Sequence, residues 1–367
     1  MGVVVSPFRV RLWDTTGTGR GRGDLKAIID DAKNIGGSED ANAPGDFFMT
    51  LPYNHPQIAE CLPLLRHYEV SRHDGTAYQP IFHGLLNDYD ATANEVVFYG
   101  QDYLSLFNES ITGAATSYAN TAIHTIITDA LTNAISQYET WPSVHSNSRL
   151  GFMGLGTIDT TTETATVLSA YEPRLDWMRR NLQVLSAGTS TRPIVQVSRT
   201  SSSTFTVGFN KNQGSDQNDV RLEYGANVND FRYVPGFREY TTDMYAIGQK
   251  REGATILYSH QSSTAANTYG WIQRGGVYLD QTNQVSFDDF VKSERRDSLR
   301  IGKTLSVKLK SGVLAPWDGY DLGDSLRVVI NRGPVAVDAL YTLWGLAWVG
   351  RADGSEELTL SLQPKDV

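Results

Sequence analysis

The chain has 367 residues and a formal net charge of −9, from 32 basic and 41 acidic side chains. This length exceeds what one hydrophobic core usually supports, so about two to four domains are expected. With 40% hydrophobic and 20% charged residues, the composition is that of a folded globular protein and excludes a disordered chain. The negative balance argues against a surface that grips nucleic acid, because phosphate binding relies on clustered lysine and arginine.

Membrane insertion, secretion and disulfide bonding are not expected either. No stretch approaches the ~20 apolar residues of a membrane span. Residues 1–7 lack the charged and apolar regions of a signal peptide, so synthesis in a cytosol is predicted. Cys61 is the only cysteine, which excludes an intramolecular disulfide and a thiolate metal cage. We interpret it as a buried structural thiol.

Residues 1–112 show the alternation of half-buried strands. Phe8, Val10 and Leu12 alternate with arginines, so one face of this run is apolar and the other polar. Further strand-like runs lie at 46–51, 67–72, 81–86 and 95–99. Half-buried antiparallel strands of this kind build small sheets and barrels, and this block is large enough for one barrel.

The rest of the chain divides into three blocks. Residues 113–188 carry two amphipathic helices, one spanning Ile123 to Ile135 and one that begins at Pro173. Residues 189–297 return to strands and end in a short amphipathic stretch at 287–292. The strand-like runs of that block lie at 194–197, 204–207, 220–224 and 254–258. Residues 298–367 are again alternating strands, similar in kind to the first block.

The glycine-rich segment at residues 17–23 invites comparison with a phosphate-binding loop. A phosphate cradle needs backbone N–H groups that lead into a helix, and its Walker form ends in Gly-Lys-Ser/Thr. That ending is missing here. We interpret the segment as a flexible hairpin loop suited to docking on a neighbouring subunit.

Neither a metal site nor a catalytic site is predicted. Histidines stand at positions 55, 67, 73, 83, 124, 145 and 260, and none has the close spacing of metal ligands. A cell-wall hydrolase would need two carboxyls ~5 to 9.5 Å apart. Asp288 and Asp289 are adjacent and point differently, while Asp14, Glu69 and Glu163 have no visible partner. With no Gly-x-Ser-x-Gly elbow or Cys–His pairing either, we predict no enzyme activity and no cofactor.

Aromatic residues offer a second kind of binding face. The chain has seven Trp and 18 Tyr, which could line a sugar-binding surface. Trp271, Trp317, Trp344 and Trp348 fall late in the chain, but residues 343–348 look like a strand packed on both faces. Burial in the core or in a subunit interface is the favoured interpretation.

Several short segments occur in a characteristic order and spacing. In the first half they are residues 8–13, 42–45 leading into 48–52, 82–85 and 99–104, and in the second half 227–230, 269–270, 322–328 and 353–360. Together they resemble the minor tail proteins, or baseplate (tail) hub proteins, of long-tailed bacteriophages. The match spans nearly the whole chain, although no single motif is unique.

The resemblance implies a mainly β fold with α+β insertions, in which two tube-like β-barrel domains carry helical and β accessory domains. Residues 1–112 would form the N-terminal barrel, 113–188 a helix-containing α+β domain, 189–297 a second β-rich accessory domain, and 298–367 the C-terminal strands of the second barrel. The resemblance also implies a long strand within residues 25–35, where local periodicity favours a helix. We expect a strand there.

The same resemblance implies a homotrimer that closes the tail tube at the tip of the virion, assembled in the host bacterial cytoplasm. Three copies of two barrels would match the sixfold ring of distal tail or tube protein. Other implied partners are the tape-measure protein, a central fibre or spike, other minor tail proteins, and viral DNA passing through the lumen. From the net charge we expect a lumen face poor in Lys and Arg. The alternatives are a host cell-surface carbohydrate-binding tail-tip protein and, third, a cell-wall hydrolase.

Overall fold

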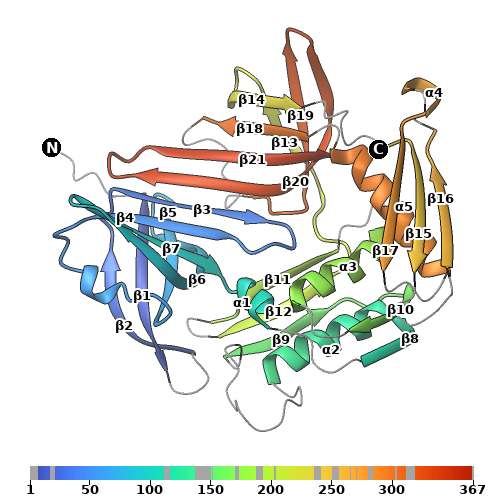
Figure 1. Cartoon of the computed structure of the whole chain (residues 1–367). Helices are drawn as coiled ribbons and strands as arrows, with labels where there is room; N and C mark the ends of the chain where they lie inside the picture. The colour runs from blue at the N-terminus through green and yellow to red at the C-terminus, as the bar shows by residue number, and fades with distance from the viewer. Residues whose placement is uncertain are drawn as a thin grey trace.

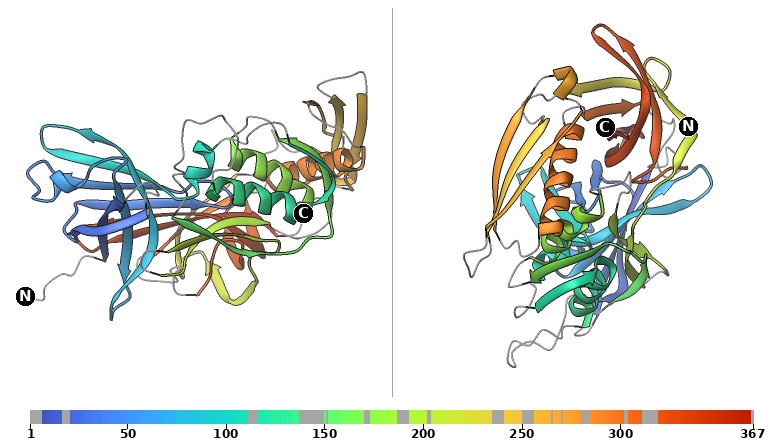
Figure 2. Two further views of the ribbon diagram at one scale, coloured as in Figure 1. Left: turned by 90° about the horizontal axis from the view of Figure 1, so that it is seen from below. Right: turned by 90° about the vertical axis from the view of Figure 1, so that its right-hand side faces the viewer.

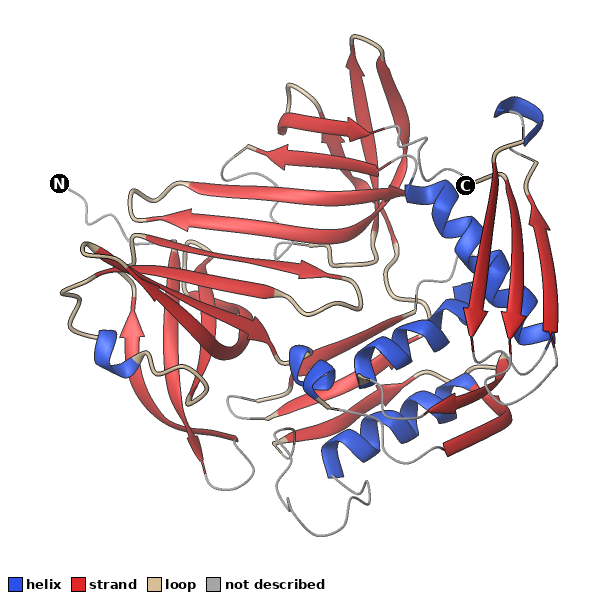
Figure 3. Ribbon diagram, viewed as in Figure 1, coloured by secondary structure: helices blue, strands red, loops and turns tan. Residues whose placement is uncertain are grey.

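The protein is a strand-rich assembly of sheets with helices gathered at one side (Figures 1 and 3). The computed structural model describes residues 7–16, 21–110, 116–136, 150, 152–169, 173–186, 193–201, 204–234, 241–249, 256–264, 266–269, 271–279, 284–301, 304–310 and 319–365.

Seven strands form the N-terminal module. They are β1 (Phe8–Thr16), β2 (Gly21–Ile29), β3 (Asn34–Asp40), β4 (Asp46–Pro52), β5 (Arg66–His73), β6 (Tyr78–Ala91) and β7 (Glu95–Asp102), with the 3-10 turn η1 (Ile58–Glu60) before β5. Their order in the sheet is β3-β4-β7-β6-β5-β1-β2, and every neighbouring pair is antiparallel. The alternation read in the sequence is confirmed, since Phe8, Val10 and Leu12 all face the core.

Residues 25–29 and 34–35 are strand, as the resemblance implied and contrary to their local helical periodicity. The one long strand expected there is interrupted at residues 30–33, since β2 ends at Ile29 and β3 begins at Asn34. Ala27 and Ile29 alternate with exposed Lys26 and Ile28, so pairing with β1 sets the burial pattern. Tertiary pairing has overridden a local helical preference here.

Six strands form the C-terminal module, and two of them come from the middle of the chain. They are β13 (Asp216–Glu223), β14 (Val228–Val234), β18 (Thr304–Leu309), β19 (Ser325–Arg332), β20 (Val335–Arg351) and β21 (Glu356–Pro364). Their order is β14-β18-β21-β20-β19-β13. Strand β20 also pairs with β3, so the two modules share one continuous 13-stranded sheet and one hydrophobic core.

A helical domain lies against the N-terminal module. It contains α1 (Ser105–Glu109), α2 (Ile123–Ser136), α3 (Arg174–Ser186), β8 (Thr116–Ala122), β9 (Met153–Ile158), β10 (Thr164–Ser169), β11 (Ile194–Arg199) and β12 (Phe205–Asn210). Both predicted helices are confirmed, and α2 buries its apolar stripe in this domain's core. The turn that leads into α1 is capped by Asp102, whose carboxylate accepts hydrogen bonds from the backbone N–H of Leu104 and Ser105 at 2.9 and 3.3 Å.

A small three-stranded sheet stands at the far side of the molecule (Figure 2). Its order is β16-β15-β17, formed by β16 (Ile256–Ser262), β15 (Asp243–Gln249) and β17 (Gln273–Leu279), with the short helix α4 (Ala266–Tyr269) between β16 and β17. Helix α5 (Gln284–Ile301) covers one face of this sheet. It is much longer than the stretch expected at 287–292, because it continues through the charged residues that follow.

The sheet pairings bear on the expected domain limits and barrels. Strand β12 pairs with β9 across the expected limit at residue 189, and β14 pairs with β18 across the limit at residue 298. Among the described strands neither module closes into a barrel, since the main path through the sheet ends at β14 and β2. The mainly β fold with helical insertions is confirmed, and the four domain boundaries stay a prediction.

Candidate assembly interface

The two sheet modules meet along an antiparallel pairing of β3 with β20. The register runs from Gly345 opposite Asp40 to Arg351 opposite Asn34. Glycines permit this close approach. A Cβ on Gly36 would collide with the Phe48 ring and the Trp348 carbonyl, so side chains are excluded at the point where the modules touch.

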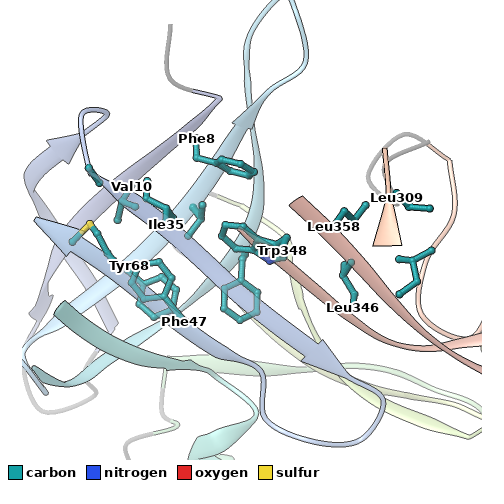
Figure 4. Close-up of a cluster of buried hydrophobic side chains, with 14 of the residues drawn as sticks. Phe8, Val10, Ile35, Phe47, Tyr68, Leu309, Leu346, Trp348 and Leu358 are labelled. Atoms are coloured by element: carbon teal, nitrogen blue, oxygen red, sulfur yellow. The ribbon is translucent and has the colours of Figure 1, made fainter. Parts of the chain in front are cut away.

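Trp348 carries the apolar part of the junction. It comes from β20 of the C-terminal module and is 2% exposed. Its ring stacks on Phe8 of β1 with centroids 4.9 Å apart (Figure 4). It also meets the Phe82 ring edge-on at 6.3 Å. The prediction that residues 343–348 belong to a core strand is confirmed for Trp348, and Trp317 lies outside the described residues. A side chain of this size, shared by both modules, holds them together as one body.

An ion pair spans the same junction. Arg72 of β5 donates to both carboxylate oxygens of Glu356 in β21, at 3.1 to 3.3 Å. Both side chains are mostly buried, at 14% and 18% exposure. A two-pronged arginine–carboxylate contact fixes orientation as well as distance.

A second, fully buried ionic cluster joins the N-terminal module to the helical domain. The Glu69 side chain is 0% exposed and lies within 2.9 Å of Arg22, 2.8 Å of Arg199 and 3.4 Å of Arg11. Arg199 belongs to β11, whereas the other members lie on β1, β2 and β5. A buried carboxylate is tolerated only with such partners, so this cluster fixes the helical domain against the sheet.

Arg22 also gives a structural role to part of the glycine-rich segment. Its guanidinium lies 4.3 Å from the ring centroid of Trp13 and 4.7 Å from that of Phe205 in β12. Residues 21–23 are therefore part of strand β2, and Arg22 is buried. Residues 17–20 of the predicted loop lie outside the described residues.

Two motif residues that carried the resemblance act as clasps. The Asn42 side chain donates to the Pro193 carbonyl and accepts from the Val195 N–H, both at 2.8 Å, which ties the 42–45 turn to β11. The Asp324 carboxylate accepts from the Ser215 and Asp321 N–H groups at 2.6 and 2.9 Å. Each clasp joins segments more than 100 residues apart in the chain, except for the local Asp321 contact.

A cavity of about 320 Å³ lies where the N-terminal module, the helical domain and the C-terminal module meet. Four carboxyls line it: Glu39, Asp40, Asp102 and Asp321. Withdrawal from water, with repulsion from Asp102 and Asp321, raises the pKa of Glu39 to about 8. Burial raises the pKa of Asp102 to about 7, and it raises the pKa values of Asp40 and Asp321 as well. Ionisation of these four carboxyls therefore opposes folding of the chain around the cavity.

His83 also lines this cavity, and its pKa is shifted in the opposite direction. Burial, followed by repulsion from Arg22 and Arg199, lowers its pKa to about 3, so the ring is neutral at physiological pH. No sequence pattern indicated this cluster, because its residues come from β3, β6, the end of β7 and the segment before β19.

The acidic residues considered for hydrolysis are held in ion pairs. Asp14 binds Arg66 at 2.6 Å, Glu163 binds Lys211 at 2.9 Å, and Glu69 sits in the arginine cluster. Asp288 and Asp289 lie in helix α5. These contacts give structural roles to Asp14, Glu69 and Glu163.

Two of the histidines are hydrogen-bonded to neighbouring side chains, and the cysteine is buried. The His67 ring is 2.7 Å from the Tyr103 hydroxyl, and His260 is 2.5 Å from Asp243, while His145 lies outside the described residues. Over the described part of the chain, no three His, Cys, Asp or Glu side chains are grouped to hold a metal ion. Cys61 is confirmed as buried, and burial raises its thiol pKa to about 12. In the same described part, no helix is long and apolar enough to cross a membrane.

Comparison with known proteins adds the fold family. No protein-family model matches the chain, and no curated protein matches its sequence. Solved structures do match. The tail protein from Neisseria meningitidis MC58 superposes with a TM-score of 0.62 at 11% identity, over 97% of this chain and 96% of that one. The chain has the fold of phage tail proteins.

Two further tail proteins have this fold over almost their full lengths. The 43 kDa tail protein of prophage MuSo2 from Shewanella oneidensis gives a TM-score of 0.64 at 11% identity, covering 98% of this chain and 99% of that one. The prophage tail protein gp18 from Listeria monocytogenes EGD-e gives 0.56 at 11% identity, covering 96% and 94%. The resemblance to tail proteins read from the sequence is thereby confirmed for the fold, over nearly the whole chain.

Proposed function

We propose that this chain is a structural tail hub protein of a long-tailed phage, three copies of which form a ring that closes the tail tube. The ring would adapt the sixfold tube to a threefold tip and leave a lumen for DNA. The observation that carries the proposal is an internal repeat: the chain contains two sheet modules with the same strand order and register, joined edge to edge.

The repeat can be followed strand by strand. The N-terminal order β3-β4-β7-β6-β5-β1 corresponds to the C-terminal order β14-β18-β21-β20-β19-β13. The registers correspond as well, since Met49 opposite Phe98 matches Val307 opposite Leu360, and all four are buried. The one reversal is that β13 runs parallel to β19, whereas β1 is antiparallel to β5. Two such modules in each of three copies provide six units for a ring.

The repeat also predicts how copies join. Within the chain, β3 pairs with the second half of the long strand β20. In the repeat, β14 of the C-terminal module corresponds to β3, and β6 of the N-terminal module corresponds to β20. Residues 88–91 of β6 pair with β7 along one edge, and on the other edge no described strand pairs with them. We therefore place β14 of one copy against residues 88–91 of the next, where Arg232 of β14 would lie diagonally across from Asp90.

The remaining parts of the proposal follow from this ring. We propose a tail-tip position in the virion and a lumen poor in Lys and Arg. We also propose contacts with the distal tail or tube ring, the tape-measure protein and a central fibre or spike. The ion-paired state of Asp14, Glu69 and Glu163 favours a non-enzymatic role. The four domains 1–112, 113–188, 189–297 and 298–367 stay part of the proposal, with β13 and β14 contributing to the second module.

Cysteine cross-linking tests the ring. Equivalence with Trp348 opposite Gly37 places Ala91 of one copy opposite Tyr233 of the next. Directly opposed residues of antiparallel strands have Cα atoms ~4.5–5.5 Å apart, which lies within the ~4.4–6.8 Å range of disulfide-bonded cysteines. We expect the A91C/Y233C variant to give covalent trimers in assembled tails on non-reducing gels. Native Cys61 should not take part in the cross-links, because it is buried.

Each single-cysteine variant serves as the control, and neither should form trimers. If the double variant runs only as monomers, from tails shown to be assembled, the proposed junction is wrong. Copy number per tail tip, counted by imaging, separates a wrong junction from a wrong stoichiometry. A copy number other than three would contradict the hub proposal itself.

A further inference from the structure

The outward face of the three-stranded sheet β16-β15-β17 is an exposed aromatic surface. Met244 and Ala246 point inward to α5, and the alternate residues Tyr245 and Ile247 point outward with 47% and 40% of their surface exposed. On the flanking strands Tyr258 and Val277 are each 66% exposed. Large apolar side chains gathered on one sheet face mark an interaction site.

This face contains a slot one residue wide. In the register of the sheet, Tyr245 lies between His260 on β16 and Gly275 on β17. The Tyr245 and His260 rings are stacked, with centroids 4.5 Å apart and planes 10° apart. Because one face of the Tyr245 ring is covered by His260, its other face is turned towards β17. There Gly275 has no side chain, and a Cβ built on it would meet no atom within 4 Å.

Polar groups lie beside the slot in fixed positions. The Asp243 side chain is fully buried and is 2.5 Å from His260 Nε2, and it accepts a hydrogen bond from Gln273 Nε2 at 3.2 Å. These contacts hold the imidazole and the amide next to the Tyr245 ring. Along β17, Gln273 and Val277 stand on either side of Gly275 on the same face. The slot is thus bounded by an aromatic face, an amide and a small aliphatic side chain.

We propose that this slot, formed by Tyr245, His260, Gln273, Gly275 and Val277, binds a pyranose ring of a saccharide. A sugar ring has C–H groups that stack on the negative face of an aromatic ring, and hydroxyls that bond to amide and imidazole groups. Asp243 engages His260 Nε2 and Gln273 Nε2, which leaves His260 Nδ1 and Gln273 Oε1 for the hydroxyls of a sugar. An aromatic or aliphatic side chain of a protein partner has no group that bonds to these two atoms. Trp271, which is 68% exposed and lies two residues before β17, offers a second stacking surface for an adjoining sugar.

The inference does not rest on the proposed ring, because every residue of the slot belongs to one copy. It assigns to the third sheet a role that the hub function does not require: contact with saccharide while the two sheet modules build the wall. The position of this sheet at the far side of the molecule, away from the β3–β20 junction, leaves both roles compatible (Figure 2).

The test uses the full chain and an array of oligosaccharides built from glucose, galactose, rhamnose and N-acetylglucosamine, followed by saturation-transfer NMR on those that bind. We expect Tyr245→Ala to weaken binding at least tenfold. Gly275→Leu should abolish it by filling the slot, and it should leave the fold intact because a Cβ there meets open space. Tyr53→Ala, at a 62% exposed tyrosine of the N-terminal module, is the matched control and should bind like the native chain.

Three outcomes would overturn the proposal. The first is that no sugar on the array binds. The second is binding that survives both Tyr245→Ala and Gly275→Leu while circular dichroism shows native folding. The third is hydrogen-exchange protection of β15–β17 by another tail protein in assembled tails, with no saccharide affinity, which would assign the slot to a protein contact. None of these outcomes alters the copy number that tests the ring.

Discussion

The substitution Glu39→Gln tests the carboxyl-lined cavity where the N-terminal module, the helical domain and the C-terminal module meet. Gln has nearly the same shape as Glu and cannot ionise. Glu39 has a pKa of about 8 because burial and the carboxylates Asp102 and Asp321 oppose its charged form. A carboxyl whose pKa is higher in the folded state binds its proton more tightly there. The stability that the fold gains from this tighter proton binding is complete below the unfolded pKa of 4.5, and it is lost as pH rises through about 8.

The size of the effect follows from the pKa. Raising a pKa from 4.5 to about 8 corresponds to roughly 5 kcal/mol, at about 1.4 kcal/mol for each pKa unit. Glu39 lines a cavity and is only partly buried, and its ionisation is coupled to that of Asp102, which reduces the figure. We expect the E39Q variant to be about 2–3 kcal/mol more stable than the native chain at pH 8.5, and equal to it at pH 5.

Urea unfolding followed by tryptophan fluorescence at pH 5, 7 and 8.5 measures this difference. Glu357→Gln is the control of opposite sign, because bonds from Lys308 and Arg351 lower the pKa of Glu357. Its charged form is favoured in the fold, so the E357Q variant should lose up to about 1 kcal/mol above pH 5. If the E39Q and native curves stay parallel from pH 5 to 8.5, the reasoning about the cavity is wrong.

Two further substitutions test the junctions. Trp348→Ala removes the ring that stacks on Phe8, so the free energy of unfolding should fall by about 3–5 kcal/mol; a loss below about 1 kcal/mol in urea unfolding would show that the modules do not depend on this contact. Glu69→Gln leaves Arg22 buried without its carboxylate partner and should destabilise by about 3–5 kcal/mol. For that variant, limited proteolysis should cut the helical domain before the sheet, and native-like resistance of that domain would refute the role of the cluster.

Sequence patterns were sufficient for the elements and for the fold class. Alternation at Phe8, Val10 and Leu12 and the helical stripe from Ile123 to Ile135 both report which face of an element is buried, and burial of an apolar face is the largest favourable term in folding. Segment order alone carried the resemblance to tail proteins, and the turn at 42–45 proved to contain a clasp. Where the pattern and the resemblance disagreed, at residues 25–35, the extended conformation was found.

Only the tertiary structure decided which segments meet. Nothing in the sequence near Arg199 indicates that it reaches Glu69, and the carboxyls of the cavity come from strands that are separate in the chain. The pairing of β14 with β18 and of β3 with β20 likewise joins distant residues. The physical reason is that side-chain alternation depends on a strand's own two faces, whereas strand partners, buried ion pairs and cavities depend on contacts across the whole chain, which leave no local pattern.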